Sequence, residues 1–334
     1  MSSLSASQPK TRNNMIQIFR ALSIIAVVMI HTTPSGVWQV FCRPFINFSV
    51  ATFLFLSGYL TKIENDNWYV FCKKRIIRVI IPYIIWTILY TVLPAVLSGG
   101  NLSRIPYNLI TARAAATMYY IFVYIQFVLL TPWLGKLAKS KYIHLGWFIA
   151  PVSTLIFKYY GLLTGVENNP YISLFWSDAC LGWFTYYYLG LLLGNQIIKP
   201  NYSLRSLILL YIVSIVLQMV EGYGWLLLGD EAYCGTQIKL TSFLTSTLFL
   251  LIVYTILNKP NIDVKSKFLR LLGDYSFGIY LCHIMVMIIL GKVPYYTSLP
   301  YPLTSVVVIL ISLGCCCLGY KICGKKMSAW LGLK

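Results

Sequence analysis

Long apolar segments recur along the whole chain and constrain its fold more than any other feature of the sequence. Of the 334 residues, 58% are hydrophobic and only 11% are charged, which is about half the charged fraction of an ordinary soluble domain. A helix of about 20 apolar residues is long enough to cross the hydrocarbon core of a bilayer. The pattern therefore predicts an all-α, polytopic integral membrane protein, and not a protein with one large soluble core.

About ten apolar segments are long enough to be drawn as transmembrane helices. Their expected ranges are 15–33, 45–61, 76–97, 117–135, 142–161, 180–197, 203–221, 239–257, 271–291 and 300–320. Loops rich in Pro, Gly and Asn separate several of them. We expect a cytoplasmic tail over residues 1–14, one membrane domain over residues 15–323, and a second cytoplasmic tail over residues 324–334.

The distribution of Lys and Arg predicts the orientation of the chain in the membrane. With ten spans, twenty of the 27 Lys and Arg residues lie in segments on the amino-terminal side, and six lie on the opposite side. Basic residues collect on the cytoplasmic side of membrane proteins, so both termini are expected in the cytoplasm. The same rule explains most of the formal charge of +18, and we expect no nucleic-acid partner.

The nine cysteines lie mostly in or beside apolar segments, and neither a CxxC motif nor a Cys/His spacing typical of metal sites is present. We therefore expect no metal site and no disulfide framework. A single disulfide among Cys42, Cys180 and Cys234 stays open, because all three fall in or near predicted outer loops.

The first apolar segment contains two ionisable residues, Arg20 and His31. At about 100° per residue, a separation of eleven positions places both on nearly the same helical face, with roughly 16 Å of axial rise between them. Ionisable residues inside a membrane-spanning helix are costly and usually face a cavity, so the pair predicts a functional site. Alternatively, Arg20 extends to the lipid headgroups and His31 only ends the helix.

A basic cluster precedes the third predicted span and contains Lys73, Lys74, Arg75 and Arg78. Arg75 and Arg78 are three positions apart and share a helix face, and guanidinium groups suit bidentate binding of phosphate. The cluster is a candidate phosphate clamp. The alternative is an ordinary anchor at the cytoplasmic membrane surface.

Two shorter motifs contain further candidate residues. The motif at residues 55–59 places Ser57 and Gly58 at the cytoplasmic end of the second span, where small residues allow helices to approach closely. Tyr280 and His283 lie three positions apart in the ninth span. A structural histidine bonded to a neighbouring helix and a catalytic histidine are both consistent with the position of His283.

The order and spacing of these motifs resemble the membrane acyltransferase type 3 family. The similarity rests on Arg20 and His31, on residues 55–59, on Arg75 and Arg78 followed by Pro82 and Tyr83, and on residues 119–132, 183–195 and 273–283. It covers nearly the whole chain, and Tyr59 stands where many members have Phe. The size of the chain is similar to that of bacterial enzymes that O-acetylate O-antigen or other surface polysaccharides.

The resemblance implies a multi-pass acyltransferase of the bacterial inner membrane. It implies cytoplasmic acetyl-CoA as the donor, and a sugar hydroxyl of O-antigen, of another surface polysaccharide or of an undecaprenyl-linked precursor as the acceptor. His31 is then expected to act as general base or acyl carrier, with Arg20 as a positioning or coenzyme A-binding group. His283 and Tyr280 are further catalytic candidates. The residues expected at the acetyl-CoA site are Arg75, Arg78, Lys74, Ser57 and Gly58.

A membrane transporter or flippase for a sugar-linked or anionic substrate is the alternative from another functional class. Proton-coupled transporters often use an acidic residue near the middle of a span, and none of the predicted spans has one. Inverted repeats or paired broken helices would favour transport, and the sequence shows neither.

Overall fold

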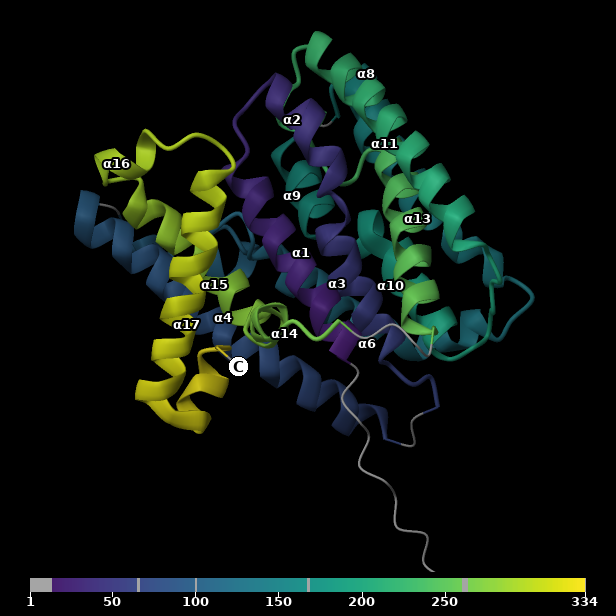
Figure 1. Cartoon of the computed structure of the whole chain (residues 1–334), viewed down its shortest axis with the longest axis horizontal. Coiled ribbons are helices and arrows are strands. Elements are labelled where there is room, and N and C mark those ends of the chain that lie inside the picture. The colour runs from purple at the N-terminus through teal and green to yellow at the C-terminus, as the bar shows by residue number, and fades with distance from the viewer. Residues whose placement is uncertain (1–13, 65–66, 100, 167–168, 260–263, 334) are drawn as a thin grey trace, which may run out of the picture.

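The computed structural model describes the chain except for residues 1–13, 65–66, 100, 167–168, 260–263 and 334. In this described part, all regular elements are helices (Figure 1), which confirms the predicted fold class. The expected tail at residues 1–14 lies, apart from Asn14, outside the described residues.

The chain forms helices of very different length. Up to residue 200, the α-helices are α1 (Asn14–Thr32), α2 (Val37–Cys42), α3 (Phe48–Tyr59), α4 (Trp68–Ser98), α5 (Ile105–Thr111), α6 (Tyr119–Ala138), α7 (Ile149–Thr154), α8 (Gly161–Thr164), α9 (Pro170–Asp178) and α10 (Phe184–Gly194). They are followed by α11 (Leu204–Leu227), α12 (Glu231–Cys234), α13 (Leu240–Leu257), α14 (Lys267–Asp274), α15 (Ser276–Leu290), α16 (Pro294–Thr297) and α17 (Leu303–Trp330). Shorter 3₁₀ and π segments are η1 (Arg43–Phe45), η2 (Leu102–Arg104), η3 (Ile143–Trp147), η4 (Leu155–Tyr160) and η6 (Cys180–Trp183).

Seven helical segments of the described chain are long and apolar enough to cross a membrane, or eight if α14 and α15, which meet at 77°, form one bent span. The expected count of ten is not confirmed. The span expected at 142–161 is divided among η3, α7, η4 and α8. In the span expected at 180–197, α10 has only 11 residues, about 16 Å of helix, which is about half the thickness of a bilayer core.

Helix α10 explains why the number of apolar segments is larger than the number of candidate membrane spans. All ten residues from Phe184 to Leu193 are buried inside the protein, so the helix is apolar because it lies in the core and not because it faces lipid. It packs along α3 with the two backbones in close contact. A Cβ on Gly190 would clash with the carbonyl of Phe55, and a Cβ on Gly58 would clash with the carbonyl of Tyr187.

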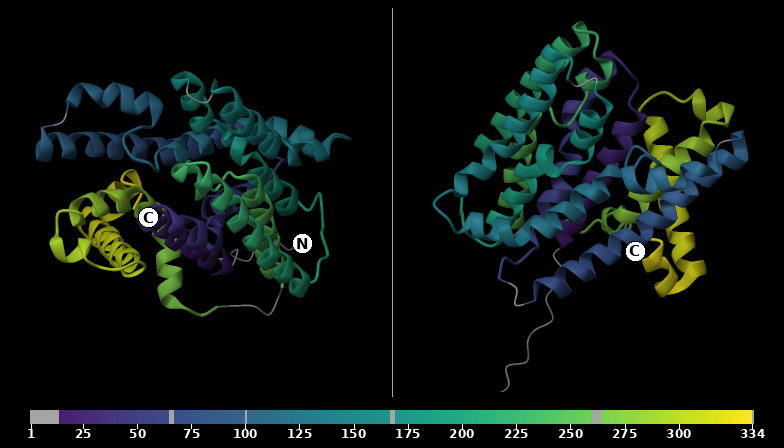
Figure 2. Two further views of the ribbon diagram at one scale, coloured as in Figure 1. Left: turned by 90° about the horizontal axis from the view of Figure 1, so that it is seen from above. Right: turned by 180° about the vertical axis from the view of Figure 1, so that it is seen from behind.

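Helix α1 lies beside α3 and contacts α14, α15 and α17 on its other sides (Figure 1). The start of α1 and the end of α17 lie at the same end of the bundle, and the end of α1 and α2 lie at the opposite end. Helix α4 runs obliquely across the back of the molecule (Figure 2). Its 31 residues span about 46 Å, more than a bilayer core, which a tilted helix accommodates.

The residues expected to form a carboxy-terminal cytoplasmic tail begin inside α17. This helix has a non-helical break at Gly324, where φ is 70°, and then continues to Trp330. The Nε1 atom of Trp86 on α4 donates to the carbonyl of Leu331 at 3.0 Å. The end of the described chain is therefore packed against α4.

Candidate active site

Two helices from distant parts of the sequence bring two histidines together. His31 lies in the last turn of α1, and its ring centroid is 5.4 Å from that of His283 on α15, with the rings tilted by 50°. The ring of Tyr280, one turn before His283, is 6.1 Å from the His283 ring. The structure thus places three of the four residues that were predicted to be catalytic next to one another.

The geometry of α15 defines the protonation of His283, which is fully buried. Its Nδ1 lies 2.9 Å from the carbonyl oxygen of Ile279, an atom that only accepts hydrogen bonds, so Nδ1 carries the proton. In the neutral ring, Nε2 is then an acceptor, and within the described residues it has no partner. A buried acceptor without a partner costs about 1–3 kcal/mol, and such an atom is a candidate to act on a reactant.

Arg20 is connected to this pair through aromatic rings and does not contact His31. Its charge lies close enough to Tyr120 on α6 to act on the hydroxyl of that residue. The Tyr120 ring is 5.4 Å from the ring of Tyr280, whose hydroxyl donates to the carbonyl of Thr117. Arg20 therefore belongs to the surroundings of the histidine pair at a distance of several side chains.

A small cavity of about 60 Å³ lies beside the histidine pair, and we call it the histidine chamber. It exceeds the ~10–15 Å³ that one water needs. Its lining consists of mostly apolar side chains and a few polar ones, as in small-molecule sites. The lining residues are Val27, Ile30, His31, Val50, Thr117, Tyr119, Gln237 and Tyr280.

Gln237 has a fixed orientation on the wall of the histidine chamber. Its Oε1 accepts from the Ser49 hydroxyl at 3.3 Å and from the Val50 amide at 3.4 Å. Both donors lie on α3, so the amide oxygen is directed toward that helix. The Nε2 group only donates hydrogen bonds. It has no acceptor among the described residues and could donate to a ligand.

A second cavity, of about 430 Å³, lies on the other side of Tyr119 and Gln237, since both residues line the two cavities. We call it the large cavity. Its volume is in the range of small-molecule sites. Segments on the predicted outer side of the membrane form it: η1, the loop before α6, η4, α9, η6 and the loop around α12.

The residues predicted to bind acetyl-CoA lie at the opposite end of the bundle from His31. The guanidinium of Arg75 donates to the Thr61 hydroxyl at 2.8 Å and lies 4.5 Å from the centroid of the Phe71 ring. The Thr61 hydroxyl in turn donates to the carbonyl of Ser57 at 2.7 Å. The structure therefore brings Arg75 and Ser57 together at the junction of α3 and α4.

The other three residues predicted at the acetyl-CoA site have less specific surroundings. Lys74 and Arg78 are exposed on the first turns of α4. Gly58 is packed against the backbone of α10, which is the close helix approach that its small size also predicted. A role of these residues in binding acetyl-CoA stays a prediction.

Sequence reasoning missed the residues that separate and line the two cavities. Gln237 lies in a loop without periodicity, and the sequence gives no signal for it. Three basic residues line the large cavity, namely Arg43, Arg113 and Lys158. In the sequence they were used only as basic residues on the predicted outer side of the membrane. Tyr119 and Trp183, which also line the large cavity, stack with ring centroids 6.0 Å apart.

A helical protein with several apolar spans, a pair of adjacent histidines and two adjoining cavities fits a membrane enzyme that carries out group transfer. The model of the acyltransferase domain family matches residues 13–321, which is nearly the whole chain. The chain therefore belongs to the membrane acyltransferase type 3 family, and it is an acyltransferase of the membrane type. The comparisons with curated proteins and with solved structures gave no match.

Proposed function

We propose that the protein transfers an acetyl group from cytoplasmic acetyl-CoA to a sugar hydroxyl of O-antigen or another surface polysaccharide, or of its lipid-linked precursor, in a bacterial inner membrane. One observation carries the proposal. His31 and Tyr280 line a small chamber between helices, and His283 lies 5.4 Å from His31, ring centroid to ring centroid. This is an enclosed, mostly apolar site in which a thioester would be protected from water.

The basic residues at the start of α4 support a donor site on the cytoplasmic side. Coenzyme A carries several phosphates, and a guanidinium group binds phosphate through two parallel hydrogen bonds. Arg75 is held in place by Thr61 and Phe71, while Lys74 and Arg78 are exposed to an incoming ligand. These three residues would hold the phosphates, and Ser57 lies close to Arg75 through Thr61.

The chemistry requires a group that takes the proton of the acceptor hydroxyl. In direct transfer, His31 accepts this proton while the hydroxyl oxygen bonds to the acetyl carbon; the carbon–sulfur bond breaks, and the coenzyme A thiolate then takes the proton. In a two-step reaction, a ring nitrogen of His31 bonds to the acetyl carbon while the carbon–sulfur bond breaks and the coenzyme A thiolate leaves. The sugar oxygen then bonds to this carbon, the carbon–nitrogen bond to His31 breaks, and the hydroxyl proton passes to the thiolate. The position of His31 on the chamber wall supports both routes.

Gln237 and His283 would assist this reaction in different ways. Negative charge develops on the acetyl oxygen in the transition state, and a fixed hydrogen-bond donor stabilises it. The Nε2 group of Gln237 is such a donor, because its Oε1 is anchored to α3. His283, whose Nδ1 is bonded to Ile279, would present Nε2 as an acceptor next to His31.

The proposal is tested by mass spectrometry of surface glycan from cells with and without this chain. We expect an added mass of one acetyl group on a single sugar residue only when the chain is present. Identical glycan spectra, together with accumulation of an unmodified glycolipid in vesicles, would instead support transport. The described residues contain one bent helix pair, whereas a transporter of the inverted-repeat type uses two such helices.

A further inference from the structure

The large cavity contains an unusual set of charges for a site that would receive a neutral sugar. Three basic side chains line it, Arg43 from η1, Arg113 from the loop before α6, and Lys158 from η4. Among the described residues, its lining includes no Asp or Glu. A cleft lined by one sign of charge raises the local concentration of oppositely charged ligands.

We propose that the large cavity binds a negatively charged group of the acceptor, and that the enzyme therefore selects an anionic glycan. The charge is a carboxylate or phosphate oxyanion, carried either by an acidic sugar or by the phosphate that joins a glycan to its lipid carrier. The identification of this ligand as an acceptor rests on the proposed function. The charge preference itself rests on the cavity.

Arg43 connects the basic lining of the large cavity to His31. Its Nη2 donates at 3.0 Å to the carbonyl of Ile30, the residue before His31. Its Nε is buried and has no partner within the described residues, although a guanidinium has five donors to satisfy. Gly235 makes room for the side chain, because a Cβ there would lie 2.6 Å from the Arg43 Cδ.

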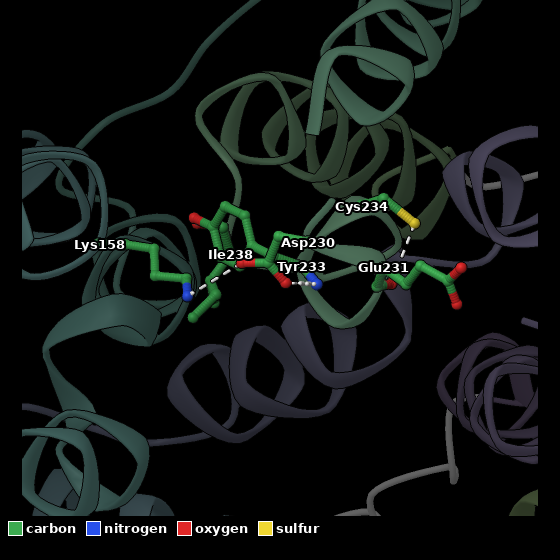
Figure 3. Close-up of polar contacts among 6 residues, drawn as sticks. All are labelled: Lys158, Asp230, Glu231, Tyr233, Cys234 and Ile238. Carbon is green, nitrogen blue, oxygen red and sulfur yellow. Dashed lines mark hydrogen bonds and ion pairs between the residues drawn. The ribbon is translucent and has the colours of Figure 1, made fainter. Parts of the chain in front are cut away.

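The other two cations have polar partners at the cavity wall, and the carboxylate of Asp178 lies near Arg113. The Arg113 guanidinium donates to the Ser177 hydroxyl at 2.6 Å. The Lys158 Nζ lies 3.4 Å from an Asp230 carboxylate oxygen (Figure 3) and 4.6 Å from the centroid of the Tyr233 ring. Asp230 is in turn fixed by the backbone amide of Tyr233 at 2.9 Å, so Lys158 has a defined position.

The aromatic side chains of the cavity suit the rest of a glycan. Trp176, Trp183, Tyr119 and Tyr233 line it, and aromatic rings provide apolar faces together with a polar tip on tyrosine. Tyr119 and Gln237 also line the histidine chamber. A sugar bound in the large cavity by its negative charge is thus next to the chamber where its hydroxyl would react.

The test measures binding of glycans to the purified full-length protein in detergent. The signal is the change in fluorescence of Trp176 and Trp183, and a smaller change in W176F would show that the signal comes from the large cavity. The probes are a neutral trisaccharide, a trisaccharide of the same length with one glucuronate, and the neutral trisaccharide carrying a 1-diphosphate. The variants are Arg113→Gln and Arg43→Gln. Arg104→Gln is the matched control, because Arg104 is exposed on the same predicted side and does not line the cavity.

We expect at least one anionic probe to bind about tenfold more tightly than the neutral one, since hydrogen bonds to charged groups are about twice as strong as neutral ones. R113Q should reduce this ratio several-fold, and R104Q should preserve it. Preference for the glucuronate identifies an acidic sugar as the source of the charge, and preference for the diphosphate identifies the lipid linkage. Equal binding of all three probes, or no binding, would overturn the inference.

Binding and acetyl transfer are separate measurements, so the two proposals can fail independently. If the wild-type protein acetylates neutral and anionic glycans equally well and R113Q does not change the ratio, the charge preference is wrong and the proposed function stands. If the protein binds anionic glycans selectively but forms no acetyl ester, the proposed function is wrong.

Discussion

The end of α1 that carries His31 and the start of α4 that carries Arg75 differ in how their functional groups are surrounded. At the first, residues from α1, α15 and the loop after α12 converge on an enclosed chamber. At the second, only Arg75 is held in place, and Lys74 and Arg78 are exposed. Acyl transfer requires water to be excluded, whereas capture of a highly charged donor from the cytoplasm requires accessible cations. The contrast supports a division into chemistry and donor binding.

The largest expected effect tests the chemical half of this comparison. Replacing His31 with Ala should lower the rate of acetyl transfer by about 10²–10⁴-fold, the usual contribution of a general base, while the protein still reaches the membrane. The measurement is transfer of labelled acetyl to glycan in isolated membranes. His144→Ala is the matched control, because His144 is exposed in η3, and it should retain wild-type activity.

Gln237→Ala should lower kcat by about 10²–10³-fold, as loss of one oxyanion donor does in other acyl-transfer enzymes. The KM for acetyl-CoA should change little, because Gln237 lies at the end of the molecule away from Arg75. Ser49→Ala is an informative partner variant. It removes one of the two hydrogen bonds that orient Gln237, so a smaller reduction in kcat is expected. If Q237A keeps the wild-type kcat, the amide has no part in the reaction.

A substitution in α10 tests whether the two regions depend on a common support. Helix α3 contributes Val50 to the histidine chamber, and Thr61 just after it holds Arg75. Gly190→Ala should push α10 away from α3 and destabilise the protein by about 1–3 kcal/mol, seen as a lower melting temperature in detergent. Gly224→Ala is the control, because a Cβ there meets nothing within 4 Å. An equal melting temperature for both variants would contradict the close packing.

The smallest effect is expected at the donor end. Arg75→Ala should raise the KM for acetyl-CoA by about tenfold, the cost of losing one charge-assisted contact, with kcat nearly unchanged. Lys141→Ala, an exposed basic residue on the same predicted side, should leave KM unchanged. If R75A lowered kcat without a change in KM, Arg75 would take part in the chemistry. The division between a donor-binding end and a chemical end would then be wrong.

The sequence could predict what depends on local pattern. The apolar segments were sufficient to predict the helical membrane fold, and the eleven-residue spacing of Arg20 and His31 indicated a functional site on the first helix. The contact of His31 with His283 could not be derived from pattern, because it joins helices from opposite ends of the chain. Gln237 gave no signal, since a loop residue has no periodicity. The span count differed because α10, buried on all sides, is as apolar as a helix in lipid.

The central claim is that acetyl from the cytoplasmic side reaches an acceptor on the opposite side through the chamber at His31. Sealed membrane vesicles with acetyl-labelled acetyl-CoA on the cytoplasmic face and glycan acceptor on the other face test it directly. The account predicts labelled glycan with the wild-type protein and formation of labelled glycan about 10²–10⁴-fold slower with His31→Ala at equal protein levels. Labelled glycan formed by H31A at the wild-type rate, or transfer only when donor and acceptor share one face, would contradict it.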